Sequence, residues 1–172
     1  ERIDMKLAVD VVLLPPEEVG DIAISVNQRL LNEGNEGIAL SKENCLPHIS
    51  LNMGVIDEKD LEKATRVLAR IADECLPIEL SITKVHTQIH QRTGKLISDF
   101  TIGLTRKIQE LHEMIMRKLV AIKHGEQAHI TWAGDVNGLT RSWTKNYQRD
   151  SSYEKFYPHI TVGFGQAELK KP

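Results

Sequence analysis

Cysteine, aromatic residues and uninterrupted apolar runs are all scarce in this 172-residue sequence. The two cysteines, Cys45 and Cys75, are far apart and form no CxxC pair, which favours a reducing compartment. The apolar stretch at residues 7–14 is interrupted by Asp10, is too short to span a bilayer and lacks the flanks of a signal peptide. We therefore expect a cytoplasmic protein that has no membrane partner.

A positive charge excess is also missing, since 22 Lys and Arg face 24 Asp and Glu and the formal net charge is −2. This charge balance argues against a protein that binds long duplex nucleic acid through many phosphate contacts, but it is compatible with a small phosphate ligand. Hydrophobic residues make up 41% of the chain, which is enough for one sizeable core at this length. The sequence predicts a single domain and a monomer.

Hydrophobic periodicity predicts both strands and helices along the chain. Strands are expected at residues 7–14, 47–55, 78–83, 95–102 and 157–164, and helices at residues 16–34, 57–76 and 104–122. The polar stretch at residues 126–155 predicts turns and a long loop. This order of elements is typical of an α+β fold and not of an uninterrupted parallel α/β sheet.

A short motif occurs twice in the sequence. Residues 46–51 read LPHISL and residues 157–162 read YPHITV, so that His48 and His159 are 111 positions apart. On a strand, each histidine and the hydroxyl residue two positions later point to the same face, about 6.6 Å apart, while the isoleucine between them points to the other. Each copy therefore presents an imidazole beside a hydroxyl.

Two such copies facing one ligand would supply the groups that phosphodiester chemistry needs. One imidazole of His48 and His159 can take a proton while the other gives one, and the hydroxyls of Ser50 and Thr161 can bind phosphate oxygens. Because the ordinary pKa of histidine is about 6.5, a neutral base and a protonated acid can coexist near neutral pH. A single strand histidine is more often structural, but packing alone gives no reason for the motif to recur.

The two copies of the motif contain His-Ile-Ser and His-Ile-Thr, and they resemble the paired histidine motifs, or tetrads, of the two-histidine (2H) phosphoesterase superfamily. This superfamily includes the 2′-5′ RNA ligase-like proteins and RNA cyclic phosphodiesterases. The resemblance implies a duplicated, two-lobed fold over residues 1–172, with antiparallel-rich sheets around a central cleft. It also implies that His48 and His159 are the acid–base pair, that Ser50 and Thr161 hold the phosphate, and that neither metal nor another cofactor is needed. The implied substrates are RNA ends with a 2′,3′-cyclic phosphate, or small cyclic or 2′-5′-linked nucleotides, with ligation as the reverse reaction.

A third match to the minimal motif occurs at residues 129–131, which read HIT. His129 follows His48 by 81 positions, a separation that would also suit the family. We favour His159 because Pro158, Val162 and Gly163 match the fuller pattern of the family that the motifs resemble, whereas Ala128 and residues 132–134 do not. His129 remains a candidate for a neighbouring position in the site.

Seven of the eight aromatic residues lie between positions 132 and 164, where they alternate with basic side chains. Stacking of one ring on a base is worth about 1 to 3 kcal/mol, so Trp143, Tyr147 and Tyr157, together with Arg149 and His129, are candidates for substrate binding. Alternatively, these rings pack the core of the second lobe. Two non-enzymatic hypotheses stay open beside the phosphodiesterase: a nucleotide-binding module without turnover, and a scaffold with vestigial tetrads.

Overall fold

The computed structural model describes residues 5–90, 94–134 and 136–165 of the chain. Within these residues it contains four α-helices and two three-stranded sheets, which confirms the α+β class. None of the helices in this described part is long and apolar enough to cross a membrane. The chain divides into two compact units, and each unit is drawn from three separate stretches.

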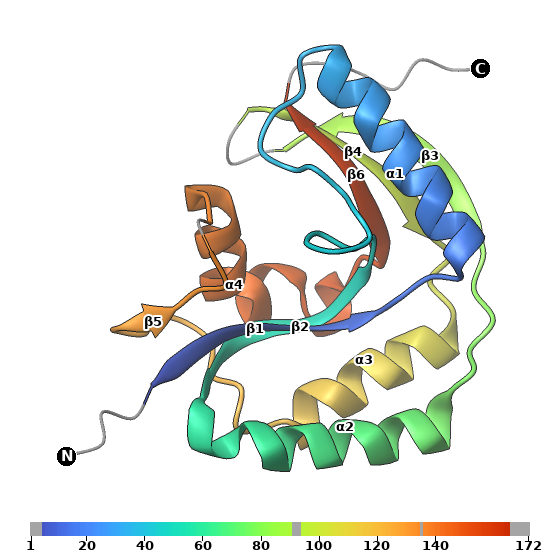
Figure 1. The fold of residues 1–172 in the computed structure, drawn as a ribbon. Coiled ribbons are helices and arrows are strands. Elements are labelled where there is room, and N and C mark those ends of the chain that lie inside the picture. The colour runs from blue at the N-terminus through green and yellow to red at the C-terminus, as the bar shows by residue number, and fades with distance from the viewer. Residues whose placement is uncertain (1–4, 91–93, 135, 166–172) are drawn as a thin grey trace. The chain divides into compact units, whose positions relative to one another are not determined.

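Unit 1 is drawn from Glu1–Val11, Ser50–Glu79 and Leu104–Phe156. In its sheet, β1 (Lys6–Leu13) lies between β2 (Ile49–Asp57) and β5 (Ile130–Thr131). The short strand β5 runs parallel to β1. The ribbon shows β1 and β2 side by side, as the sheet order requires (Figure 1).

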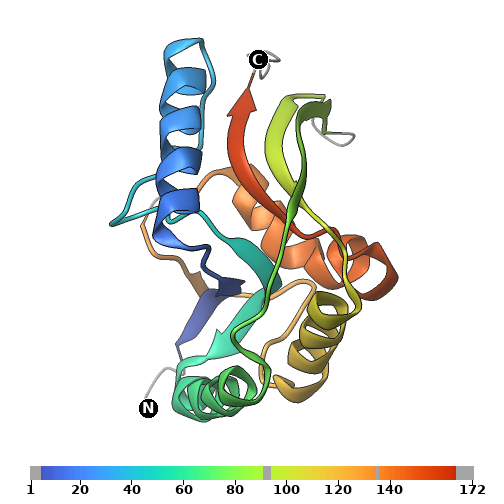
Figure 2. The same cartoon turned by 90° about the vertical axis from the view of Figure 1, so that its right-hand side faces the viewer.

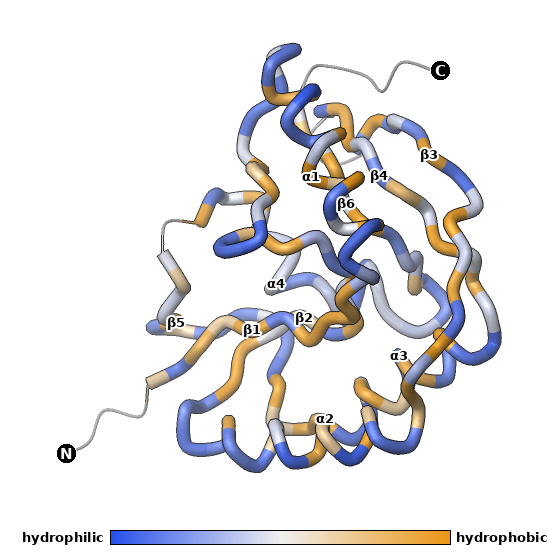
Figure 3. Tube along the Cα trace, turned by 45° about the vertical axis from the view of Figure 1, so that its right-hand side comes forward, coloured by the Kyte–Doolittle hydropathy of each residue, from blue (hydrophilic) through white to orange (hydrophobic). Residues whose placement is uncertain are grey.

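Helices α2 (Leu61–Cys75) and α3 (Arg106–Lys118) of unit 1 pack against each other. The predicted apolar stripes supply buried residues to both, among them Ala64 and Ile71 of α2 and Ile108 of α3. Hydrophobic and hydrophilic residues alternate along α2, as expected for a helix with one buried face (Figure 3). A short 3-10 helix, η1 (Glu58–Asp60), leads from β2 into α2.

Helix α4 (Gly138–Ser151) lies where the sequence predicted turns and a long loop, so that prediction was wrong. The Asn137 side chain caps this helix by accepting a hydrogen bond from the Thr140 N–H at 2.9 Å. Its buried residues are Thr144 and Tyr147. Because polar residue types form the buried face, no aliphatic stripe revealed the helix. A second 3-10 helix, η2 (Tyr153–Lys155), follows it.

Unit 2 is drawn from Val12–Ile49, Leu80–Gly103 and Tyr157–Pro172. Its sheet places β4 (Leu96–Ile102) between β3 (Ile82–Ile89) and β6 (His159–Gly165), antiparallel to both. Helix α1 (Glu17–Asn32) packs along β6 (Figure 2). The strand predicted at residues 78–83 is displaced, since β3 begins only at Ile82. Because β3 is an edge strand, several of its apolar side chains are exposed. The pattern of apolar residues therefore does not show where this strand begins and ends.

Candidate functional site

The two histidines of the repeated motif have the same local hydrogen bond. His48 Nδ1 lies 2.6 Å from the carbonyl oxygen of Leu46, and His159 Nδ1 lies 2.7 Å from the carbonyl oxygen of Tyr157. Because a carbonyl oxygen can only accept, Nδ1 of each ring must carry the proton. In each neutral imidazole, Nε2 is therefore the atom with the lone pair, which can accept a proton from a ligand.

Burial along both motifs follows the predicted alternation. Ile49 and Ile160 are 3% and 1% exposed, whereas His48 and His159 are half-buried. Both imidazoles belong to unit 2. The isoleucines thus anchor the two strands in apolar surroundings while the imidazoles retain access to solvent.

Ser50 is held by two neighbours within unit 1. Its hydroxyl donates to Asp10 Oδ2 on β1 at 2.7 Å, and its carbonyl oxygen accepts a hydrogen bond from the Tyr147 hydroxyl at 3.2 Å. Tyr147 is only 5% exposed, and burial, with the Asp10 charge as a smaller cause, raises the pKa of its phenol. The Tyr147 hydroxyl therefore helps to fix the backbone of Ser50. The hydrogen bond to Asp10 directs the single proton of the Ser50 hydroxyl toward a carboxylate.

Strand β4 brings two polar residues alongside the second motif. In the antiparallel register of β4 and β6, Thr101 lies opposite His159 and Asp99 lies opposite Thr161. Asp99 is fully buried, at 0% exposure. Nothing in the sequence singled out Asp99 or Thr101, because only the strand register shows that they neighbour the motif.

The buried carboxylate of Asp99 is surrounded by hydrogen-bond donors. It accepts from Thr101 Oγ1 at 2.9 Å, from Gln88 Nε2 at 3.2 Å and from the Tyr157 hydroxyl at 3.3 Å. His86 Nδ1 on β3 lies 3.6 Å from Asp99 Oδ1. A buried carboxylate is costly unless it is paired in this way. The network therefore links β3 and β4 to Tyr157, which lies two residues before β6.

Tyr157 joins this network to the imidazole of His159. The two rings are tilted by 30° with centroids 5.1 Å apart, and the Tyr157 hydroxyl lies 2.6 Å from Thr101 Oγ1. Burial is the main cause that raises the pKa of this phenol, so it stays protonated near neutral pH. The Tyr157 residue is 41% exposed, so its ring can contact a ligand beside His159.

A second feature recurs at the carbonyl three residues after each motif histidine. In unit 1, His112 Nδ1 on α3 donates to the Leu51 carbonyl oxygen at 2.8 Å. In unit 2, Asn27 Nδ2 on α1 donates to the Val162 carbonyl oxygen at 2.9 Å. Both donors are 0% exposed. Each motif strand thus accepts a hydrogen bond from a helix of its own unit at the third residue after the motif histidine.

The other sequence-predicted residues lie in different surroundings. His129 is exposed and immediately precedes β5, and its backbone has a left-handed φ of 54°. In the described part of the chain, its ring does not form the hydrogen bond to the carbonyl two residues earlier, that of Gln127, which His48 and His159 form. Trp143 is half-buried on α4. Arg149 is exposed and pairs with Asp150 through two hydrogen bonds of 2.7 and 2.9 Å. His129 therefore does not share the local geometry of His48 and His159.

The possible metal ligands and the two thiols are the remaining reactive groups in the part of the chain that the structure describes. No group of three or more His, Cys, Asp or Glu side chains there could hold a metal ion. Cys45 and Cys75 are free, and burial raises the pKa of the Cys45 thiol, which disfavours the nucleophilic thiolate.

A scan against protein-family models found no match, and a search of the curated proteins found none either. Function is therefore inferred from the two motifs and their geometry.

Proposed function

We propose that this chain is a metal-independent phosphodiesterase of the two-histidine type, in which His48 and His159 form the acid–base pair. Its substrates would be RNA ends with a 2′,3′-cyclic phosphate, or small cyclic or 2′-5′-linked nucleotides. The observation that carries the proposal is the shared hydrogen bond from Nδ1 of each imidazole to the carbonyl two residues earlier. This bond selects the same tautomer twice and assigns proton exchange to Nε2 in both rings.

In the proposed reaction, a water molecule attacks the phosphorus of the cyclic ester. One imidazole, neutral at the start, takes a proton from the water through Nε2, and the other, protonated at the start, gives its proton to the departing ribose oxygen. A phosphorus–oxygen bond to water forms, the bond to one ribose oxygen breaks, and a phosphomonoester results. Acid–base transfer of this kind contributes about 10²- to 10⁴-fold to the rate.

The hydroxyls of Ser50 and Thr161 would bind the non-bridging phosphate oxygens. For Ser50 this requires rotation of its proton away from Asp10, to which the hydroxyl donates at 2.7 Å. Tyr157, whose ring lies 5.1 Å from that of His159, would contact the nucleoside. Donors already placed around the phosphoryl group would stabilise its developing charge in the transition state.

The proposal includes a duplicated architecture of two lobes whose antiparallel-rich sheets surround a central cleft. Its support is the pair of equivalent features at the two motifs: the imidazole-to-carbonyl bond, and the buried helix side chain that binds the carbonyl of Leu51 or Val162. A carboxylate on the adjacent strand, Asp10 or Asp99, accompanies each motif as well.

The test is turnover of nucleoside 2′,3′-cyclic monophosphates by the purified chain with a chelator present. His48→Ala and His159→Ala should each lower kcat/KM by about 10²-fold or more, because each removes one proton transfer. His90→Ala on unit 2 is the matched control and should retain turnover. Full activity of the His48→Ala, His159→Ala double variant would contradict the proposal. Loss of activity in His129→Ala with retention in His159→Ala would contradict the choice of His159.

Nucleotide binding without turnover is the second candidate function. The hydrogen bond from Ser50 to Asp10 favours it, because it engages the only proton of that hydroxyl and places a carboxylate beside the motif. This alternative predicts measurable affinity for nucleotides and no product from any cyclic or 2′-5′-linked substrate. Calorimetry and the turnover assay on the same sample distinguish the two functions.

A further inference from the structure

A pocket of about 300 Å³ lies within unit 1. Its walls are formed by residues on both sides of β5, by the first turns of α4 and by Val55 of β2. Neither His48 nor His159 lines it. The volume is at the lower end of the range of about 300 to 1,000 Å³ that is typical of ligand pockets, so it suits a small molecule.

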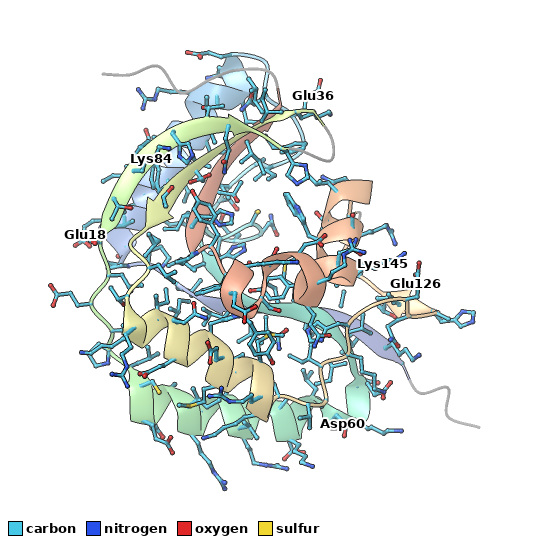
Figure 4. All side chains as sticks on the ribbon, turned by 180° about the vertical axis from the view of Figure 1, so that it is seen from behind. Glu18, Glu36, Asp60, Lys84, Glu126 and Lys145 are labelled. Atoms are coloured by element: carbon cyan, nitrogen blue, oxygen red, sulfur yellow. The ribbon has the colours of Figure 1, made fainter. Side chains whose placement is uncertain are left out.

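Two cationic side chains of α4 line this pocket. Arg141 and Lys145 are four residues apart and therefore lie on the same face of the helix. Lys145 forms an ion pair with Glu126, and both side chains are visible together in Figure 4. Because these side chains are 44% and 78% exposed, their attraction is weak, and a more highly charged anion can displace Glu126.

An aromatic ring holds the second cation in position. The Arg141 guanidinium lies over the indole of Trp132, 4.9 Å from the ring centroid. A guanidinium that lies over a ring still has N–H groups directed away from the ring, and these can donate two hydrogen bonds to a phosphate. Trp132 thus orders Arg141 and also presents aromatic surface to the pocket.

The rest of the lining is partly apolar. Val55 and Ile130 contribute aliphatic surface, and His129 adds an exposed imidazole beside them. A small inorganic anion would leave the indole and the aliphatic surface uncovered, whereas an apolar ligand would leave two cations unmatched. A ligand with a planar ring and a doubly charged phosphate matches both kinds of surface.

We infer that this pocket binds a nucleoside monophosphate, with the phosphate on Arg141 and Lys145 and the base against Trp132, Val55 and Ile130. The site is independent of the proposed phosphodiesterase function, because it contains no residue of the two favoured motifs. A nucleotide bound here would act as an effector or as a second ligand of the chain.

The test is calorimetric titration of the full chain with AMP, adenosine and inorganic phosphate. Arg141→Met and Lys145→Met should each weaken AMP binding by about tenfold or more, because each removes a charge-assisted contact. Arg70→Met and Lys107→Met make the same substitutions at exposed positions of unit 1 outside the pocket and should leave the affinity unchanged. Adenosine and inorganic phosphate should each bind at least about tenfold more weakly than AMP, since each satisfies only one kind of surface.

Glu126→Gln gives a test in the opposite direction. It removes the carboxylate that competes for Lys145, so AMP should bind more tightly, a gain that misfolding cannot produce. Unchanged or weaker binding by this variant would overturn the inference, as would equal binding by the Arg141→Met variant and the wild type.

The His48→Ala, His159→Ala double variant separates this inference from the proposed function. It should lose turnover and keep its AMP affinity. If AMP affinity disappears in that variant, the nucleotide occupies the motif site and the pocket inference fails. If turnover is absent in the wild type while AMP binding depends on Arg141, the proposed function fails and the pocket inference stands.

Discussion

At the scale of single residues, the sequence predicted the two motif histidines but not the buried carboxylate near the second of them. His48 and His159 were found from the repeat because residue type and spacing were sufficient. Asp99 was not found, because an aspartate within a strand usually faces water. Its 0% exposure and its place opposite Thr161 depend on the pairing of β4 with β6.

Replacement of Asp99 by Asn should destabilise the chain by about 1 to 3 kcal/mol, the usual cost of leaving buried polar groups unpaired. The amide offers one accepting oxygen in place of two and places an N–H₂ group against the donors Thr101, Gln88 and Tyr157. Urea unfolding of the variant measures this loss.

Asp73→Asn on the exposed surface of α2 is the matched control for this substitution and should change the stability by no more than about 0.5 kcal/mol. If Asp99→Asn and Asp73→Asn unfold at the same urea concentration, Asp99 is not the centre of the network.

At the scale of elements, aliphatic periodicity predicted α1, α2 and α3, and it missed α4. The difference lies in the buried face, which is formed in α4 by Thr144 and Tyr147. An element of this kind is stabilised by its cap at Asn137 and by tertiary contacts such as the Tyr147 hydrogen bond to Ser50, and neither appears as a hydrophobic repeat.

Close packing of β2 can be tested at Gly54. A methyl group there would lie 2.6 Å from the Lys123 carbonyl oxygen and 2.6 Å from Ile122 Cγ2, so the backbone would have to move. Gly54→Ala should destabilise the chain by about 1 to 3 kcal/mol, the usual cost of overpacking. Gly138→Ala, also in unit 1, meets nothing within 4 Å and is the control. Equal thermal midpoints for the two variants would contradict this account of the strand.

At the scale of the whole molecule, each unit combines distant stretches of chain, and the interior of unit 1 includes titratable groups. His112 donates through Nδ1 to the Leu51 carbonyl and accepts through Nε2 from the Tyr153 N–H at 2.9 Å, and it stacks on Phe156 with centroids 4.0 Å apart. Burial is the main cause that lowers the pKa of His112, and burial also lowers the pKa of His124.

The stability of the chain should therefore fall as the pH decreases from 7 to 5.5. A lowered pKa means that the folded chain binds fewer protons than the unfolded chain, whose histidines have a pKa of about 6.5. The stabilisation is fully present above that value and is lost as the pH falls toward the folded-state pKa. Urea unfolding at several pH values measures the slope.

His112→Gln preserves a donor and an acceptor without a titratable ring, and His124→Gln removes a second, half-buried imidazole. The double variant should reduce the dependence of the unfolding free energy on pH in this window. A slope equal to that of the wild type would show that other groups cause the loss of stability.

Local residue patterns were sufficient to predict the α+β class, three helices and the two repeated motifs, because alternation and helical spacing are properties of neighbouring residues. Tertiary pairing alone set Asp99 beside Thr161, Tyr147 beneath Ser50, and Arg141 over Trp132. These contacts depend on strand register and on which segments are buried together. Both are determined by the free energy of the whole core, which no short stretch of sequence contains.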